Sequence, residues 1–184
     1  MEAIAMLVKE HDSILKMIEI TQTILNTTDV KTVKIDHVDQ IIDFIINFAD
    51  KYHHLKEEDV LFMEMEKHGM STESGPIAVM LSEHDKGRIF IKQALDAVGR
   101  LKFGDDRAFE ELKLNLLNYC VLLTNHIAKE NNILYPMAQR ILPSNVVLAM
   151  TKQFETTNSS TVENEYFDKY LKRVDELSAI YLNE

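Results

Sequence analysis

The feature that most constrains this chain is a pattern of histidine and glutamate that occurs twice. Each copy has a histidine inside a Glu-His-Asp sequence and, further along, a histidine and a glutamate four residues apart. The six residues are His11, His54, Glu58, His84, His126 and Glu130. Residues four apart lie one turn apart on the same face of a helix. The pattern therefore predicts helices that present imidazole and carboxylate groups to a shared interior.

Apolar residues recur every three to four positions over long stretches, which predicts an all-α protein. The 184 residues include only five Gly and three Pro, so few positions interrupt these stretches. The predicted helices cover residues 3–27, 37–68, 76–102 and 106–141. Short connections make neighbouring long helices antiparallel. We expect an antiparallel up-down-up-down four-helix bundle with extra C-terminal helices.

The chain divides into two predicted parts. Residues 1–142 form the bundle, and residues 143–184 form a C-terminal helical extension packed on it. Pro143 separates the two, and helices are expected over 144–154 and 161–182. The last helix has an apolar stripe, which predicts packing on the bundle, on a protein partner or on a second copy in a homodimer.

Composition excludes several functions. The net charge of −10 argues against nucleic-acid binding, because phosphate contacts need a basic surface. No apolar run approaches the roughly 20 residues of a membrane span, so no membrane association is expected. The N-terminal sequence lacks the basic region of a signal peptide, and the single cysteine, Cys120, fits a reducing compartment. The expected location is the cytoplasm.

The second predicted helix offers two registers for its histidine and glutamate. A helical wheel at about 100° per residue places His54 and Glu58 within about 70° of the centre of the apolar stripe. It places His53 and Glu57 on the opposite side. We therefore predict that His54 and Glu58 face the interior, and that His53 and Glu57 lie in solvent or behind the metal ligands.

Counting along antiparallel helices brings the four predicted inward histidines to about the same level of the bundle. Buried carboxylates are costly unless they are paired or bind a metal. Histidine and glutamate suit iron, manganese or zinc, whereas calcium and magnesium prefer oxygen ligands. Two carboxylates that can each bridge favour two metals over one, and the small number of protein ligands leaves positions for an external ligand.

These motifs resemble the hemerythrin-like family, the HHE cation-binding domain, over residues 3–141. The resemblance implies a non-haem di-iron centre with an oxo or hydroxo bridge, so iron is expected ahead of manganese or zinc. It implies that Glu58 and Glu130 bridge the two ions. By the same resemblance, His11 and His54 bind one iron, and His84 and His126 bind the other.

Arg88 departs from the pattern of the oxygen-carrying members, which have a fifth histidine one turn after the third. Two interpretations stay open for Arg88: it pairs with a carboxylate near the site or stabilises a bound anion, or its stem packs while its head reaches solvent. Tyr119 lies two turns before His126 on the inward face. Two interpretations stay open for Tyr119: it lies next to the metal ligands, or it is only part of the core. His53 and Glu57 are the other residues expected next to the ligands.

Two classes of function follow. The first is a non-haem di-iron protein that binds or senses O2 or NO, or handles iron. The alternative is a di-iron enzyme with peroxidase-like or catalase-like activity, or one that repairs iron–sulfur clusters. Whether the chain is an enzyme stays open. The expected partner is a small ligand such as O2, NO or peroxide.

Overall fold

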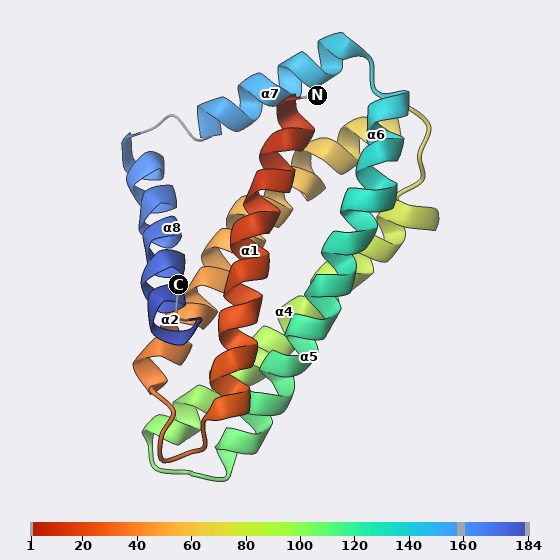
Figure 1. The fold of residues 1–184 in the computed structure, drawn as a ribbon. Coiled ribbons are helices and arrows are strands. Elements are labelled where there is room, and N and C mark those ends of the chain that lie inside the picture. Colours follow the sequence, from red (N-terminus) through yellow and green to blue (C-terminus); the bar gives the residue numbers. More distant parts are fainter. Residues whose placement is uncertain (1, 158–160, 183–184) are drawn as a thin grey trace.

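The computed structural model describes residues 2–157 and 161–182, and within them it consists of helices and loops without strands (Figure 1). The fold is the predicted helix bundle with extra C-terminal helices. The first long helix is α1 (Glu2–Thr27) and the third is α4 (Gly75–Lys102). The second is continuous through α2 (Ile35–Phe44), η1 (Ile45–His54), η2 (Glu57–Phe62) and α3 (Met63–Lys67). The fourth runs through α5 (Ala108–Lys129), η3 (Glu130–Leu134) and α6 (Tyr135–Ile141).

Glycines end two of the long helices. Gly69 follows α3 with φ 98°, and Gly104 follows α4 with φ 89°. Both values lie in the left-handed region, which costs glycine little because it has no Cβ. Pro76 lies in the first turn of α4, where its missing N–H is not needed. These residues set the helix ends close to their predicted positions.

Three segments of the long helices, η1, η2 and η3, are π-helical. A π-helix forms i→i+5 hydrogen bonds, so each turn takes more residues than in an α-helix. All three segments lie at the level of the histidines and glutamates. Side-chain directions there cannot be taken from an α-helical wheel.

The apolar core is divided into two clusters by a layer of buried polar residues. On α1, Leu7 belongs to one cluster and Ile14 to the other, and the buried His11 lies between them. On the fourth helix, His126 and Glu130 lie in the same way before Leu134, which belongs to the cluster of Leu7. The layer therefore crosses the whole bundle.

The C-terminal helices α7 (Ser144–Thr157) and α8 (Thr161–Tyr181) both contact α1. Figure 1 shows α7 crossing the N-terminal end of α1 and α8 running beside α1 and α2. Phe154 of α7 joins the core cluster of Leu7, and Tyr170 of α8 joins that of Ile14. The extension thus packs on the bundle, although a boundary at residue 142 stays a prediction.

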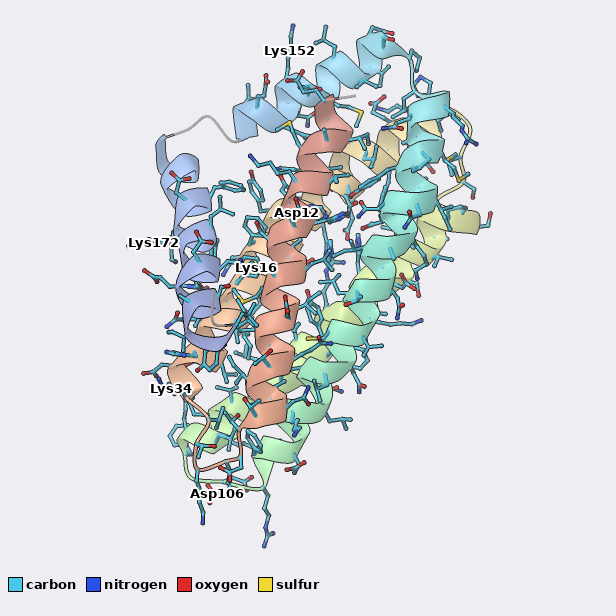
Figure 2. All side chains as sticks on the ribbon, in the orientation of Figure 1. Asp12, Lys16, Lys34, Asp106, Lys152 and Lys172 are labelled. Carbon is cyan, nitrogen blue, oxygen red and sulfur yellow. The ribbon has the colours of Figure 1, made fainter. Side chains whose placement is uncertain are left out.

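Several charged side chains lie on the outer surface of these helices. In Figure 2, Asp12 lies on the outer side of α1, Lys152 on α7 and Lys172 on α8. None of the helices in the described ranges is long and apolar enough to cross a membrane.

Candidate metal centre

Two groups of buried side chains meet in the polar layer, with potential ligand atoms within 4.8 Å of one another in each group. We call them cluster 1 and cluster 2. Cluster 1 consists of His11, His53, Glu57 and Glu130, and cluster 2 of His54, Glu57, His84 and His126. Glu57 belongs to both. Four separate segments of the chain therefore supply one continuous centre.

The interior register of the second helix differs from the prediction. His53 and Glu57, assigned to solvent or behind the ligands, are 1% and 0% exposed and belong to the clusters. Glu58, predicted to face the interior, has a 22% exposed side chain and lies outside both clusters. The error arises in η1 and η2, because a wheel at 100° per residue assumes α-helical geometry. His54 faces the centre as predicted, so both adjacent histidines do.

The sequence holds a signal for the observed register. The chain contains His-x-x-Lys-Glu twice, ending at Glu57 and at Glu130. With this alignment, His11 and His53 are 42 residues apart, and so are His84 and His126. Matching the lysines of the two copies would have selected His53 with Glu57 over His54 with Glu58.

Acceptor oxygens outside the clusters fix the orientation of each imidazole. His53 Nδ1 lies 2.9 Å from Glu10 Oε2, and His126 Nδ1 lies 3.0 Å from Glu83 Oε2. Because an ionised carboxylate only accepts, each Nδ1 donates its proton, which leaves Nε2 with a lone pair. This is the arrangement of most metal-binding histidines.

The other three histidines are held similarly. His84 Nδ1 is 2.6 Å from Glu58 Oε1, His11 Nδ1 is 2.9 Å from Asn131 Oδ1, and His54 Nδ1 is 3.4 Å from Asp50 Oδ1. Glu58 therefore orients a cluster histidine from outside the clusters.

The Nε2 atoms face one another in pairs. His11 Nε2 is 2.9 Å from His53 Nε2, and His84 Nε2 is 3.0 Å from His126 Nε2. Two lone pairs at this distance repel unless a proton or a cation lies between them. Nitrogen ligands lie about 2.1 Å from an ion such as zinc, so two of them at a right angle are about 3.0 Å apart. The histidines thus fit one metal per cluster.

The carboxylates also fit a cation. Glu57 Oε2 and both Glu130 oxygens are buried and have no hydrogen-bond partner among the residues that the structure describes. Glu57 Oε2 lies 3.8 Å from His53 Nε2 and 3.6 Å from His84 Nε2, so it reaches both clusters. Glu130 also reaches both, at 3.3 Å from His11 Nε2 and 3.0 Å from His126 Nε2. Both glutamates can therefore bridge two ions.

Burial shapes the pKa values of the centre. It lowers the pKa of His53 well below 6.5 and, with the charge of His84, lowers that of His54 to about 3. Both imidazoles are neutral at pH 7, the form that binds metals. Burial and the negative charge of Glu130 raise the pKa of Glu57 well above its ordinary value. A bound cation would replace the proton that Glu57 otherwise holds.

Comparison with known proteins places the centre in a family. A sequence profile for the hemerythrin HHE cation binding domain matches residues 2–138. The chain belongs to this family. No solved structure gives a significant match.

Curated relatives of this HHE domain include the iron-sulfur cluster repair protein YtfE of Yersinia pestis (strain Pestoides F) and of Yersinia pseudotuberculosis serotype O:1b (strain IP 31758). Each is 35% identical over 94 residues. The alignments cover 48% of this chain and 41% of each relative. The chain therefore spans less than half the length of the curated relatives that it matches.

The two halves of the HHE domain support the clusters in the same way. Lys56 Nζ donates to Glu10 Oε1 at 2.6 Å, behind His53. Lys129 donates to Glu83 in the second half, behind His126. Each Glu–Lys pair spans 46 residues, so the centre has an approximate internal two-fold symmetry.

Arg88 and Tyr135 break this symmetry on opposite sides. Arg88 donates to Asp50 at 3.0 Å and to Glu58 at 2.7 Å, so it pairs with carboxylates that hold cluster 2, the first of its two interpretations. Tyr135, which the sequence interpretation missed, donates to Glu57 Oε1 at 2.6 Å. Its ring stacks on His11 at 5.6 Å, beside cluster 1.

Proposed function

We propose that this HHE domain is a non-haem di-iron protein that binds or senses O2 or NO. One observation supports this above all: five buried histidines divide unequally between two clusters that share carboxylates. Cluster 1 has two histidines and cluster 2 has three. If Glu57 and Glu130 each reach both ions, an ion in cluster 1 would have four protein ligands and an ion in cluster 2 would have five. The ion with fewer protein ligands has an open position for an external ligand.

The proposed ligands differ from those implied by resemblance alone. His11 and His53 would hold one iron, and His54, His84 and His126 the other, with Glu57 and Glu130 bridging. When bound, the two irons supply the redox chemistry that O2 and NO binding requires. The chain orients the imidazoles through their Nδ1 atoms and directs Tyr135 toward Glu57.

His54 changes the significance of Arg88. The sequence interpretation questioned oxygen binding because Arg88 replaces a fifth histidine on α4. In the structure, η1 supplies two buried histidines instead of one, His53 and His54, so the centre has five; the ring of His54 stacks on that of His84 with 3.8 Å between centroids. This histidine supports oxygen binding without a ligand at position 88.

Metal analysis with an absorption spectrum tests the proposal. Protein purified in air is expected to contain about two irons per chain and to show the charge-transfer bands of bridged di-iron. Stopped-flow mixing of the reduced protein with O2, and separately with NO, should give a stable spectral change. A colourless chain that takes up no iron under reducing conditions would refute the di-iron centre. Reduced, iron-loaded protein that reacts with neither gas would refute the proposal that it binds O2 or NO.

His54→Ala tests the unequal division of histidines. We expect it to lower the affinity for iron at one position, because cluster 2 loses an imidazole. His68→Ala is the matched control, because the His68 ring is bonded to Glu64 O at 2.7 Å, outside both clusters. Equal iron affinity in wild type and His54→Ala would remove His54 from the ligand set.

The similarity to YtfE motivates a second candidate, repair of iron–sulfur clusters. In this function the centre would deliver iron to a damaged cluster. The test mixes the iron-loaded chain with a dehydratase whose [4Fe–4S] cluster has been damaged by NO, with a thiol reductant. Recovery of dehydratase activity beyond that given by equimolar free ferrous iron supports repair, and equal recovery argues against it.

A further inference from the structure

A cavity of about 220 Å³ lies beside cluster 2, between η1 and α4. His54 and His84 form part of its wall. Ile45, Ile46 and Ile91 form the aliphatic part of the wall, with Leu95 half-exposed, and Asp50, Arg88 and Lys92 supply charged groups. An apolar cavity of about 150 Å³ holds a benzene molecule, so this one has room for a slightly larger ligand. An aliphatic wall favours an apolar body.

Tyr119 contributes one polar group to this wall. Its side chain is 3% exposed, yet its hydroxyl has no hydrogen-bond partner within residues 2–157 and 161–182. Because no protein acceptor in the described residues takes this hydroxyl, it can donate to a molecule in the cavity. Burial and the nearby charges of Cys120 and Asp50 raise the pKa of Tyr119 well above 10.0, so its hydroxyl stays a donor.

Gly87 keeps the cavity open. A Cβ at this position would lie 3.4 Å from the Tyr119 ring, in close van der Waals contact with it. Any larger side chain would extend into the space beside the ring. Gly87 has an ordinary helical backbone, so a larger residue here would be limited by packing against Tyr119 and Leu122.

The charges at the rim do not favour an anionic ligand. Arg88 is surrounded by three carboxylates, those of Asp50, Glu58 and Asp85. Lys92 is exposed at the rim and forms no ion pair in the described part of the chain. Two cations against three carboxylates, on a chain of net charge −10, give a carboxylate ligand no net attraction.

We propose that this cavity binds a small neutral molecule with an apolar body and one hydrogen-bond acceptor, such as a ketone slightly larger than benzene, whose carbonyl oxygen accepts a hydrogen bond from the Tyr119 hydroxyl. The occupant lies against His54 and His84, next to the proposed metal pair. Its binding requires the cavity and not iron, so it goes beyond the proposed function.

Isothermal titration calorimetry on the full chain as purified tests this with three probes of one size. Acetophenone has the acceptor, ethylbenzene lacks it, and benzoate carries a charge. Acetophenone is expected to bind most tightly. Tyr119→Phe should lower the affinity for acetophenone about fivefold to tenfold, because one neutral hydrogen bond is lost, and should leave the affinity for ethylbenzene unchanged. Tyr181→Phe is the control, because its hydroxyl contacts His37 on the bundle surface.

Leu95→Trp gives a second variant at a half-exposed position, where folding is insensitive to the change. The indole should fill the rim of the cavity and lower the affinities for acetophenone and for ethylbenzene by a similar factor. Acetophenone affinity unaffected by both Tyr119→Phe and Leu95→Trp, tighter binding of benzoate, or no binding of any probe would overturn the proposal. Iron content is measured in parallel, so absence of iron with normal acetophenone binding would overturn only the di-iron function.

Discussion

Glu57 and Glu58 are adjacent residues with different positions in the site. Glu57 is fully buried between both clusters, and Glu58 orients His84 from a partly exposed position. We predict that Glu57→Gln loses at least half of the bound iron, because a neutral amide is a poor bridging ligand. Glu58→Gln should keep full iron stoichiometry, with an affinity about 10- to 100-fold weaker. Iron per chain and competition with a chelator measure both.

Loss of iron from Glu58→Gln, with full retention by Glu57→Gln, would contradict this assignment. It would restore the register predicted from the α-helical wheel.

Arg88 stabilises the surface next to cluster 2 in a pH-dependent way. Burial alone would raise the pKa of Asp50, but hydrogen bonds from His54 and Arg88 and the charge of Arg88 lower it from 3.8 to about 2. A lowered folded-state pKa stabilises the protein above the unfolded value, and this stabilisation is lost as pH falls through the folded value. Arg88→Met should therefore cost about 1 kcal/mol at pH 7, allowing for the exposed guanidinium.

Urea unfolding of the metal-free wild type and Arg88→Met measures this difference. The difference in the free energy of unfolding should stay constant between pH 7 and 5, and should become smaller as pH falls from 3.8 toward 2. A difference independent of pH would show that Arg88 acts by packing alone.

At the scale of helices, the sequence determines most of what the structure shows. Apolar spacing, Gly69, Gly104 and Pro76 give helix limits within a few residues of those observed. The π-helical segments could not be predicted, because i→i+5 bonding depends on tertiary packing and leaves no clear mark on composition. They account for the misplaced Glu57 and Glu58, whereas His11, His84 and Glu130 lie where the helix periodicity put them.

The described side chains of α8 pack on the bundle and belong to neither cluster. Tyr170 is 1% exposed, lies 6.0 Å from Phe44 between ring centroids, and donates to Asp43 at 3.2 Å. Tyr170→Ala should lower the free energy of unfolding by about 3 kcal/mol, because it empties a buried aromatic position. Lys172→Ala, exposed on the same helix, should change it by less than about 0.5 kcal/mol. Chemical denaturation measures both.

Iron per folded chain should be unchanged in Tyr170→Ala. Loss of iron together with stability would show that α8 supports the metal centre as well as the bundle.

For the whole molecule, the polar layer between the two apolar clusters makes stability depend on the metal. Without a cation, paired imidazole nitrogens and unpartnered carboxylate oxygens are buried together, which is costly. Removing iron with a chelator should lower the melting temperature by about 10 °C or more. This is the shift expected when the free ion concentration is about a thousand times its dissociation constant. Calorimetry measures this shift.

Ferrous iron should restore the melting temperature, and magnesium should not, since it prefers oxygen ligands. An identical melting temperature with and without iron would show that the polar layer is stable alone.

The division of the ligands between the two helical hairpins has a consequence for how the chain is held together. Residues 2–67 supply His11, His53, His54 and Glu57, and residues 75–141 supply the rest, so neither hairpin contains a complete cluster. A chain cut in the loop between Gly69 and Gly75 would give two fragments that each carry part of both metal sites. Addition of the ion would then drive fragment complementation, with the metal acting as the cross-link that the peptide bond no longer provides.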